Sequence, residues 1–295
     1  MSLFSLLLIL GSAVIHVVAH VALKRTQNRA AFVWWMLLWG CVLFSPVLLL
    51  GWQPIPPLAW AVLVASAIFE ALYFLSIAKA YETSDLSVAY PLARGTAPVF
   101  LLLWSTAFLK ERPTIEGVLG IVGLIASGLY LINLPHLGAW REPLRALRAQ
   151  GPRFALAAGL FISLYTVLDR YGIGLAQGSS YWWPLLYTYL ALWFTWLFLT
   201  PWTLAAVGWK NLKEELRSSR AASFIAGATT LAAYAVVLYA MNAGTPASYA
   251  GAVREISVVL GAAAGVFLLK EKGTVMRIVG GTLVAGGVAV IALFG

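Results

Sequence analysis

Long apolar runs alternate with short polar segments along the whole chain. A spanning helix needs about 20 mostly apolar residues. Ten such runs lie near residues 2–23, 31–51, 58–80, 87–109, 115–133, 154–176, 181–203, 221–243, 247–269 and 275–294. The longest polar segments, HLGAWREPLRALRAQGPR and GWKNLKEELRSSR, are too short to fold as soluble domains. The pattern predicts an all-α membrane protein with ten transmembrane helices.

Composition supports a lipid environment. Of the 295 residues, 61% are hydrophobic and 11% are charged, whereas soluble domains carry about 25% charged residues. The single cysteine, Cys41, excludes an intrachain disulfide. MSLFSLLLIL lacks the basic n-region and cleavage site of a signal peptide, so it is interpreted as the start of the first span. No cofactor is expected.

The net charge of +9 is distributed unevenly between the two ends of the predicted bundle. One end has Lys110, Arg112 and Arg170. The other end collects Lys24, Arg25, Arg29, Lys79, Arg141, Arg145, Arg148, Arg153, Lys210, Lys213, Arg217, Arg220, Lys270, Lys272 and Arg277. The positive-inside rule makes this second end cytoplasmic and places both termini outside. The basic charge therefore indicates a bilayer as partner and not a nucleic acid.

The chain contains an internal repeat. Residues 80–120 superpose on 240–280 without a gap, which aligns Ala80 with Ala240, Arg94 with Arg254, Lys110-Glu111 with Lys270-Glu271, Thr114 with Thr274 and Gly120 with Gly280. Each half holds five spans, so the second half enters the membrane inverted. The predicted architecture is two inverted five-helix repeats, 1–133 and 154–295, around a central cavity, joined by a basic cytoplasmic linker, 134–153.

The doubled unit, with its fourth and ninth spans closed by LKERPT and LKEKGT, resembles the EamA-type transporters of the drug/metabolite transporter (DMT) superfamily. The resemblance covers nearly the whole chain. It implies a ten-helix carrier with a central cavity in the bacterial cytoplasmic (inner) membrane, which exports amino acids or other metabolites, often in exchange for protons. Many relatives keep both termini in the cytoplasm, and the charge distribution here departs from that arrangement.

Ionisable residues inside apolar spans are the main candidates for a substrate site, because such residues mark transport pathways. They are His16, Glu70, Arg94, Asp169, Arg254 and Glu255. By depth, Glu70 is expected to pair with Arg94 and Asp169 with Arg254. Purely structural ion pairs are the alternative. Glu70 is the most central and is the candidate proton carrier. His16 and His20 share one helix face, without a third metal ligand or an HExxH-type motif.

Aromatic and small residues add further predictions. Tyr73, Tyr90 and Tyr165 are expected to line the cavity, although core packing explains tyrosines at these depths equally well, as it does for Tyr187 and Tyr234. The tryptophans at 34, 35, 39, 182 and 183 fit an interfacial belt. GAAAG at 261–265, with Gly280, Gly281, Gly286 and Gly287, predicts close packing of the last two helices.

The charges of the candidate site nearly balance, which suits an amino acid or an amine. The predicted function is therefore a secondary active transporter, an exporter of a small polar organic metabolite that works by alternating access with proton coupling, as a monomer or weak dimer. The alternatives are a carrier of an organic anion or phosphate compound held by the two arginines, a membrane-embedded enzyme that uses the histidines and carboxylates, and a channel. The sequence has no Walker motif for direct ATP coupling.

Overall fold

The computed structural model describes residues 1–83, 86–132, 134, 136–141, 149–176, 181–260 and 275–295. Within these ranges all regular structure is helical. The first half contains α1 (Leu3–Arg25), α2 (Arg29–Leu43), α3 (Val47–Leu50), α4 (Pro57–Thr83), α5 (Leu86–Phe108), α6 (Ile115–Val118), the π-helix η1 (Leu119–Ala126) and α7 (Ser127–Ile132). The 3₁₀ turn η2 (Leu137–Ala139) lies between the two halves. The second half contains α9 (Gln150–Gly174), α10 (Trp183–Ala206), α11 (Gly208–Asn242), α12 (Ala247–Arg254) and α14 (Val275–Phe294).

Each of the ten predicted runs contains helix in the described residues. The second run is α2 and α3, interrupted near Pro46, and the fifth is α6, η1 and α7 in series. Of the ninth run, the structure describes residues 247–260. By length and composition, seven helical segments among the described residues are able to span a membrane. The all-α membrane class is therefore confirmed, while the count of ten spans stays a prediction.

One predicted linker is helical. GWKNLKEELRSSR was expected to be a polar connection before a span near 221, but α11 already begins at Gly208 and has a kink at Ser219, where φ is −129°. Leu212 is fully buried in this stretch, and its carbonyl accepts a hydrogen bond from the indole of Trp35 at 2.8 Å. An apolar side chain that packs on the neighbouring helix thus stabilises helix in a segment that composition alone marks as a loop.

Several tryptophans expected in an interfacial belt are buried inside the protein. Trp34, Trp35 and Trp183 are 5%, 9% and 1% exposed. The indole of Trp34 donates to Thr200 Oγ1 at 2.9 Å, so it links α2 to α10. Trp182 is 41% exposed, in agreement with a belt position.

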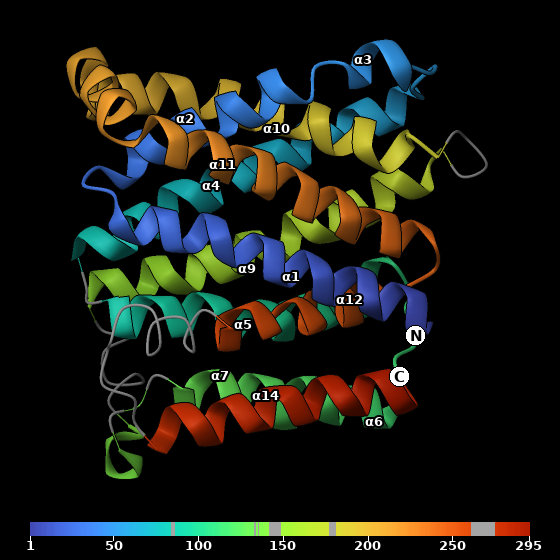
Figure 1. The fold of residues 1–295 in the computed structure, drawn as a ribbon. Coiled ribbons are helices and arrows are strands. Elements are labelled where there is room, and N and C mark those ends of the chain that lie inside the picture. The colour runs from blue at the N-terminus through green and yellow to red at the C-terminus, as the bar shows by residue number, and fades with distance from the viewer. Residues whose placement is uncertain (84–85, 133, 135, 142–148, 177–180, 261–274) are drawn as a thin grey trace.

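The long helices lie side by side, and both chain termini lie at the same end of the bundle (Figure 1). There the α-amino group of Met1 donates to the carbonyl of Gly295 at 2.8 Å. The turn between α1 and α2 and the start of α11 meet at the other end, where the Glu215 carboxylate accepts hydrogen bonds from Thr26 Oγ1 and the Asn28 N–H. We call these the terminal end and the basic end. The starts of α2, α9, α11 and α14 and the turn η2 lie at the basic end (Figure 1). These segments and the residues beside them carry Arg29, Arg141, Arg153, Lys210, Lys213, Arg217, Arg220 and Arg277.

The two halves pack through equivalent interfaces. In chain order α1, α2, α4, α5 and α7 correspond to α9, α10, α11, α12 and α14. Helix α4 packs on α9 and α11 on α1; α4 also packs on α10 and α11 on α2. Helix α5 packs on α9 and α12 on α1, and three pairs of mates, α2–α10, α5–α12 and α7–α14, contact each other. These reciprocal contacts are those of an internal repeat about a pseudo-two-fold axis.

Glycines bring the fifth and tenth segments together. A Cβ placed on Gly128 would lie 2.6 Å from the carbonyl oxygen of Gly280, and one on Gly280 would lie 2.5 Å from that of Gly128. A Cβ placed on Gly287 would lie 2.8 Å from the Gly120 carbonyl oxygen of η1. The expectation that Gly280 and Gly287 serve packing of the last two helices is therefore wrong, because they face the repeat mate. Gly281 does face the ninth segment, because a Cβ placed on it would lie 3.3 Å from Val259 Cγ1. Residues 261–265 lie outside the described residues.

Candidate functional site

A cluster of buried charges lies where the two halves meet. Arg94, on α5, is 7% exposed, and Glu255, directly after α12, is 3% exposed. Arg94 Nε and Glu255 Oε2 form an ion pair at 3.2 Å, and Arg94 Nη2 donates to Ser257 Oγ at 3.3 Å. Charged groups in hydrocarbon need such partners. The pair joins the first half to the second.

Glu70 has a different partner from the one expected. It is half-buried on α4, and its Oε2 accepts a hydrogen bond from Thr195 Oγ1 of α10 at 2.6 Å. The predicted pairing of Glu70 with Arg94 is wrong, because Glu255 from the opposite half occupies the position beside that guanidinium. Adjacent spans in sequence need not turn their charged faces toward each other, since each rotates to pack on helices of the other half.

Among the residues that the structure describes, Asp169 is held by hydroxyl groups and not by an ion pair. It is 1% exposed on α9, and its two carboxylate oxygens accept hydrogen bonds from Ser66 of α4 and Tyr234 of α11. The predicted Asp169–Arg254 salt bridge is therefore replaced by hydroxyl donors. Helices from both halves contribute to this carboxylate clamp, which consists of Asp169, Ser66 and Tyr234.

Arg254 lies against an aromatic row close to these carboxylates. Its guanidinium carbon is 5.2 Å from the ring centroid of Tyr234, a cation–π contact. The ring of Tyr165 lies 6.0 Å from that of Tyr234 and 6.2 Å from that of Tyr73. Tyr234 links Arg254 to Asp169, because its ring faces the guanidinium and its hydroxyl donates to the carboxylate. Tyrosine faces, carboxylates and one guanidinium thus share a single region.

The members of this region differ in exposure. Tyr165 and Tyr234 are 7% and 6% exposed, whereas Glu70, Tyr73 and Arg254 are half-buried. The three half-buried side chains keep part of their surface uncovered by the protein, whereas the two buried tyrosines pack against them. We call Glu70, Tyr73 and Arg254 the accessible trio.

The structure brings together most of the predicted site residues. His16 lies half-buried on α1. The side chains of Tyr90 and His20 lie outside the described residues. Ser66, Thr195 and Ser257 were missed from the sequence. Ser66 carried a usable signal, since it lies four residues before Glu70 and therefore on the same helix face, but hydroxyls are common in apolar spans and mark no site by themselves.

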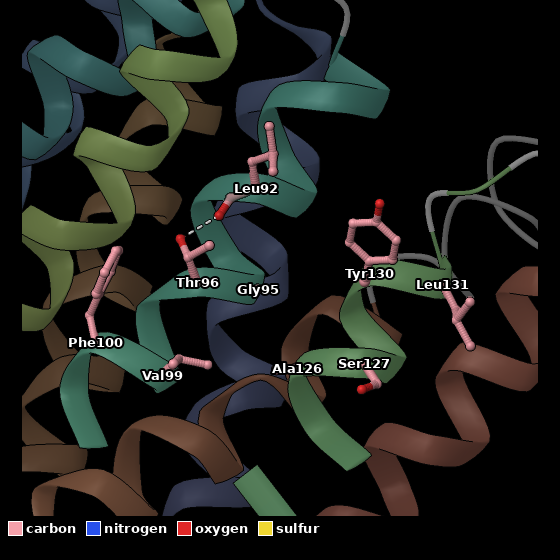
Figure 2. Close-up of a pocket in the computed structure, with 9 residues that line it drawn as sticks. All are labelled: Leu92, Gly95, Thr96, Val99, Phe100, Ala126, Ser127, Tyr130 and Leu131. Atoms are coloured by element: carbon pink, nitrogen blue, oxygen red, sulfur yellow. Dashed lines mark hydrogen bonds between the residues drawn. The ribbon is translucent and has the colours of Figure 1, made fainter. Parts of the chain in front are cut away.

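One cavity lies away from these charged residues. It has a volume of about 490 Å³ and lies between α5 and the η1–α7 segment (Figure 2). The Thr96 hydroxyl in its wall donates to the Leu92 carbonyl at 2.5 Å, and Tyr130 donates to the Trp140 carbonyl. Its polar groups are thus turned to backbone, which leaves an apolar crevice between helices, and it contains none of the candidate charges.

Metal ligands do not gather in the part of the chain described. There, no group of three His, Cys, Asp or Glu side chains is placed to hold a metal ion.

An all-α membrane fold built from two equivalent halves, with charged residues at the interface between them, is an architecture found among membrane carriers. The sequence matches the EamA-like transporter family over residues 3–134 and again over 150–293. The chain therefore belongs to this family, within the drug/metabolite transporter superfamily, as the repeat-end motifs predicted. A search of curated proteins finds no match.

The fold is also that of known structures. A solved crystal structure, described only as that of a protein, superposes with a TM-score of 0.70 over 99% of this chain and 98% of its own, at 16% sequence identity. This similarity shows the shared fold.

Proposed function

We propose that the chain is a secondary active transporter that exports a small polar organic metabolite, an amino acid or an amine, by alternating access. The observation that carries the proposal is the buried charge cluster, whose members come from α4, α5, α9 and the α12 region and so from both halves. A site shared between inverted halves changes its exposure when the halves rock against each other. A transport function also agrees with membership of the family.

The accessible trio suits a zwitterion. Glu70 offers a carboxylate to a substrate ammonium group, Arg254 offers a guanidinium to a substrate carboxylate, and the face of Tyr73 favours a cation. The second candidate, an organic anion or phosphate compound held by two arginines, is disfavoured because Arg94 is already neutralised by Glu255 at 3.2 Å. We therefore assign Arg94 and Glu255 to holding the site and the accessible trio to binding.

A ligand screen followed by transport tests this function. Purified protein is heated with amino acids, amines and organic acids, and a ligand at 100 times its Kd adds about 2.7 kcal/mol to the free energy of unfolding. Each ligand that raises the unfolding temperature is then assayed for counterflow in proteoliposomes. Uphill exchange of labelled for trapped unlabelled compound is expected. Equilibration without counterflow would instead indicate a channel, and no uptake of any stabilising ligand would reject transport.

Arg254→Gln tests the substrate class. An amino acid and the amine with the same side chain differ by the carboxylate that Arg254 is proposed to bind. The variant should lose about ten-fold or more of the preference for the amino acid, the equivalent of one charged hydrogen bond. Arg217→Gln, an exposed arginine at the basic end, is the matched control and should keep the preference. An unchanged preference in Arg254→Gln would remove Arg254 from the site.

Glu70 is proposed to carry the coupling proton. Its partner in the structure is the neutral hydroxyl of Thr195, so the carboxylate is able to take up and release a proton without breaking an ion pair of its own. Glu70→Gln should abolish uptake driven by a pH gradient. Exchange without a gradient should continue with a raised KM, because the glutamine oxygen still accepts a hydrogen bond from the substrate ammonium group but takes up no proton. Loss of both, with normal folding, would assign Glu70 to binding or structure.

The membrane arrangement forms part of the proposal. We infer ten spans in two halves, 1–133 and 154–295, joined by the linker 134–153, and the two family matches, 3–134 and 150–293, support this division. The basic end faces the cytoplasm and the terminal end faces outward, since the exposed lysines and arginines gather at the basic end.

A further inference from the structure

We propose that Glu111 is the latch that keeps the transport path closed at the terminal end, by holding the N-terminus of α12 against the end of α5. The inference rests on the proposed transport function for its meaning, but its first test needs no substrate.

Glu111 reaches α12 because of the turn that ends α5. Lys110 takes a φ of 54°, in the left-handed region that non-glycine residues seldom adopt. The N–H of Glu111 then donates to the Ser105 carbonyl at 3.2 Å. The chain reverses there, and the Glu111 side chain points across the interface between the two halves.

The carboxylate of Glu111 binds three donors of the other half. Its Oε1 accepts the Ala247 N–H at 2.6 Å, and its Oε2 accepts the Ser248 N–H at 3.3 Å and the Ser248 hydroxyl at 2.9 Å. The first N–H groups of a helix have no partner within the helix, and the N-cap residue here, Pro246, supplies no side-chain hydrogen bond. A residue of the first half therefore caps a helix of the second half, with a negative charge at the positive end of the helix dipole.

The surroundings of this contact are closed as well. The Thr114 N–H donates to the hydroxyl of Tyr249 on α12 at 2.8 Å, and the Thr114 hydroxyl donates to the Phe294 carbonyl at 3.0 Å. A Cβ on Gly117 would lie 2.3 Å from the Tyr249 hydroxyl, so the backbone of the first half at Gly117 is in contact with the Tyr249 side chain of the second half. The turn after α5 is thus fastened to both α12 and the C-terminal helix.

The far end of α12 is held differently. Arg94 pairs with Glu255 directly after the helix, where the helical hydrogen bonding is interrupted by a turn at Glu255. Helix α12 is therefore attached to α5 or its following turn at both ends. Release of the Glu111 contact frees the end of α12 nearest the surface, while the buried Arg94–Glu255 pair remains as the pivot. Opening at the terminal end thus requires the Glu111 contact to break.

A labelling experiment tests the latch. Cys41 is replaced by Ala, and a reporter cysteine is placed at Ala250, which is fully buried on α12. In detergent, Glu111→Gln should raise the rate of labelling by a hydrophilic maleimide about ten-fold, because hydrogen bonds to a neutral acceptor are about half as strong as those to a charged one. Glu116→Gln, an exposed acid in the first turn of α6, is the matched control and should leave the rate unchanged.

A second reporter separates opening from loss of folding. Ala31→Cys is equally buried but lies at the basic end, on α2. Its labelling should stay at the parent rate in Glu111→Gln. Equal increases at both reporters would mean general loosening and would overturn the latch, as would an unchanged rate at position 250.

Cross-linking adds a functional test. Glu111→Cys and Ser248→Cys, joined by a short bifunctional thiol reagent in the Cys41→Ala background, should stop counterflow, while either single cysteine treated with the same reagent should keep it. Continued transport by the cross-linked protein would show that the contact need not open. If the untreated double-cysteine protein and the parent both fail to transport, the proposed function fails, and the labelling result still decides the latch.

Discussion

Arg94 keeps its charge within an apolar span because a carboxylate of the opposite half lies beside it. The ion pair therefore joins the two halves. This contact accounts for the arginine beside Gly95 and Thr96 in the apolar stretch of α5. Asp169 shows a second solution at the same scale, in which hydroxyls of Ser66 and Tyr234 stabilise a buried carboxylate.

The Arg94–Glu255 pair makes a prediction at the residue scale. Arg94→Gln or Glu255→Gln alone leaves one buried charge without its partner, which should lower the free energy of unfolding by about 3–5 kcal/mol. The double variant should recover most of this loss. Thermal unfolding of purified protein measures it. Glu70→Gln combined with Arg94→Gln is the control and should give additive losses, because Glu70 bonds to Thr195 instead. Coupling to Glu70, with none to Glu255, would contradict the structure.

At the scale of elements, the mates of the repeat contact each other through backbone. Helix α14 approaches η1 and α7 so closely that Gly128 and Gly280 oppose each other's carbonyls, a distance that lipid-embedded helices reach only with small residues. The α5–α12 pair uses charges instead, at Glu111 and Arg94. The interface between the two halves thus has two parts. Helix α14 packs closely on η1 and α7, whereas α5 and α12 are joined by polar contacts that are able to break.

The glycine contact gives a prediction at this scale. Gly280→Ala forces a methyl group to within 2.5 Å of the Gly128 oxygen, so the helices must separate, and overpacking of this kind destabilises by about 1–3 kcal/mol. Gly286→Ala, on the same helix with nothing within 4 Å of the added methyl, should be neutral or stabilising by up to about 1 kcal/mol. Unfolding temperatures in detergent compare the two. Equal effects would show that α7 and α14 are not in backbone contact.

At the scale of the whole molecule, the two ends differ in charge and in their fastening. Glu215 of the second half binds the turn between α1 and α2 at the basic end, and Glu111 of the first half binds α12 at the terminal end. Each half thus contributes one carboxylate that caps a segment of the other, at opposite ends of the bundle. This arrangement suits a carrier that opens one end at a time.

Orientation in the membrane is the prediction at this scale. In the Cys41→Ala background, a cysteine at Ser2 or Phe294 should react with an impermeant maleimide added to intact cells, and one at Arg141 or Arg153 should react only after the membrane is opened. These positions lie at the terminal end and the basic end. The reverse labelling would invert the assignment of inside and outside and leave the fold unchanged.

The sequence by itself determined the membrane class, the helices within the apolar runs, the repeat and the family, because the apolar runs and the repeated LKERPT and LKEKGT turns are local features of the chain. It did not reveal the helix at Gly208, which depends on the packing of Leu212. It also placed Glu70, Arg94, Asp169, Arg254 and Glu255 as candidates, since any charge in an apolar run stands out. Only the tertiary structure decided which of them touch. Pairing depends on how each helix rotates about its axis and on which helix of the other half packs against it, and neither is a function of depth along a span. Arg94 therefore pairs with Glu255 instead of Glu70, and Asp169 accepts hydrogen bonds from two hydroxyls instead of pairing with Arg254.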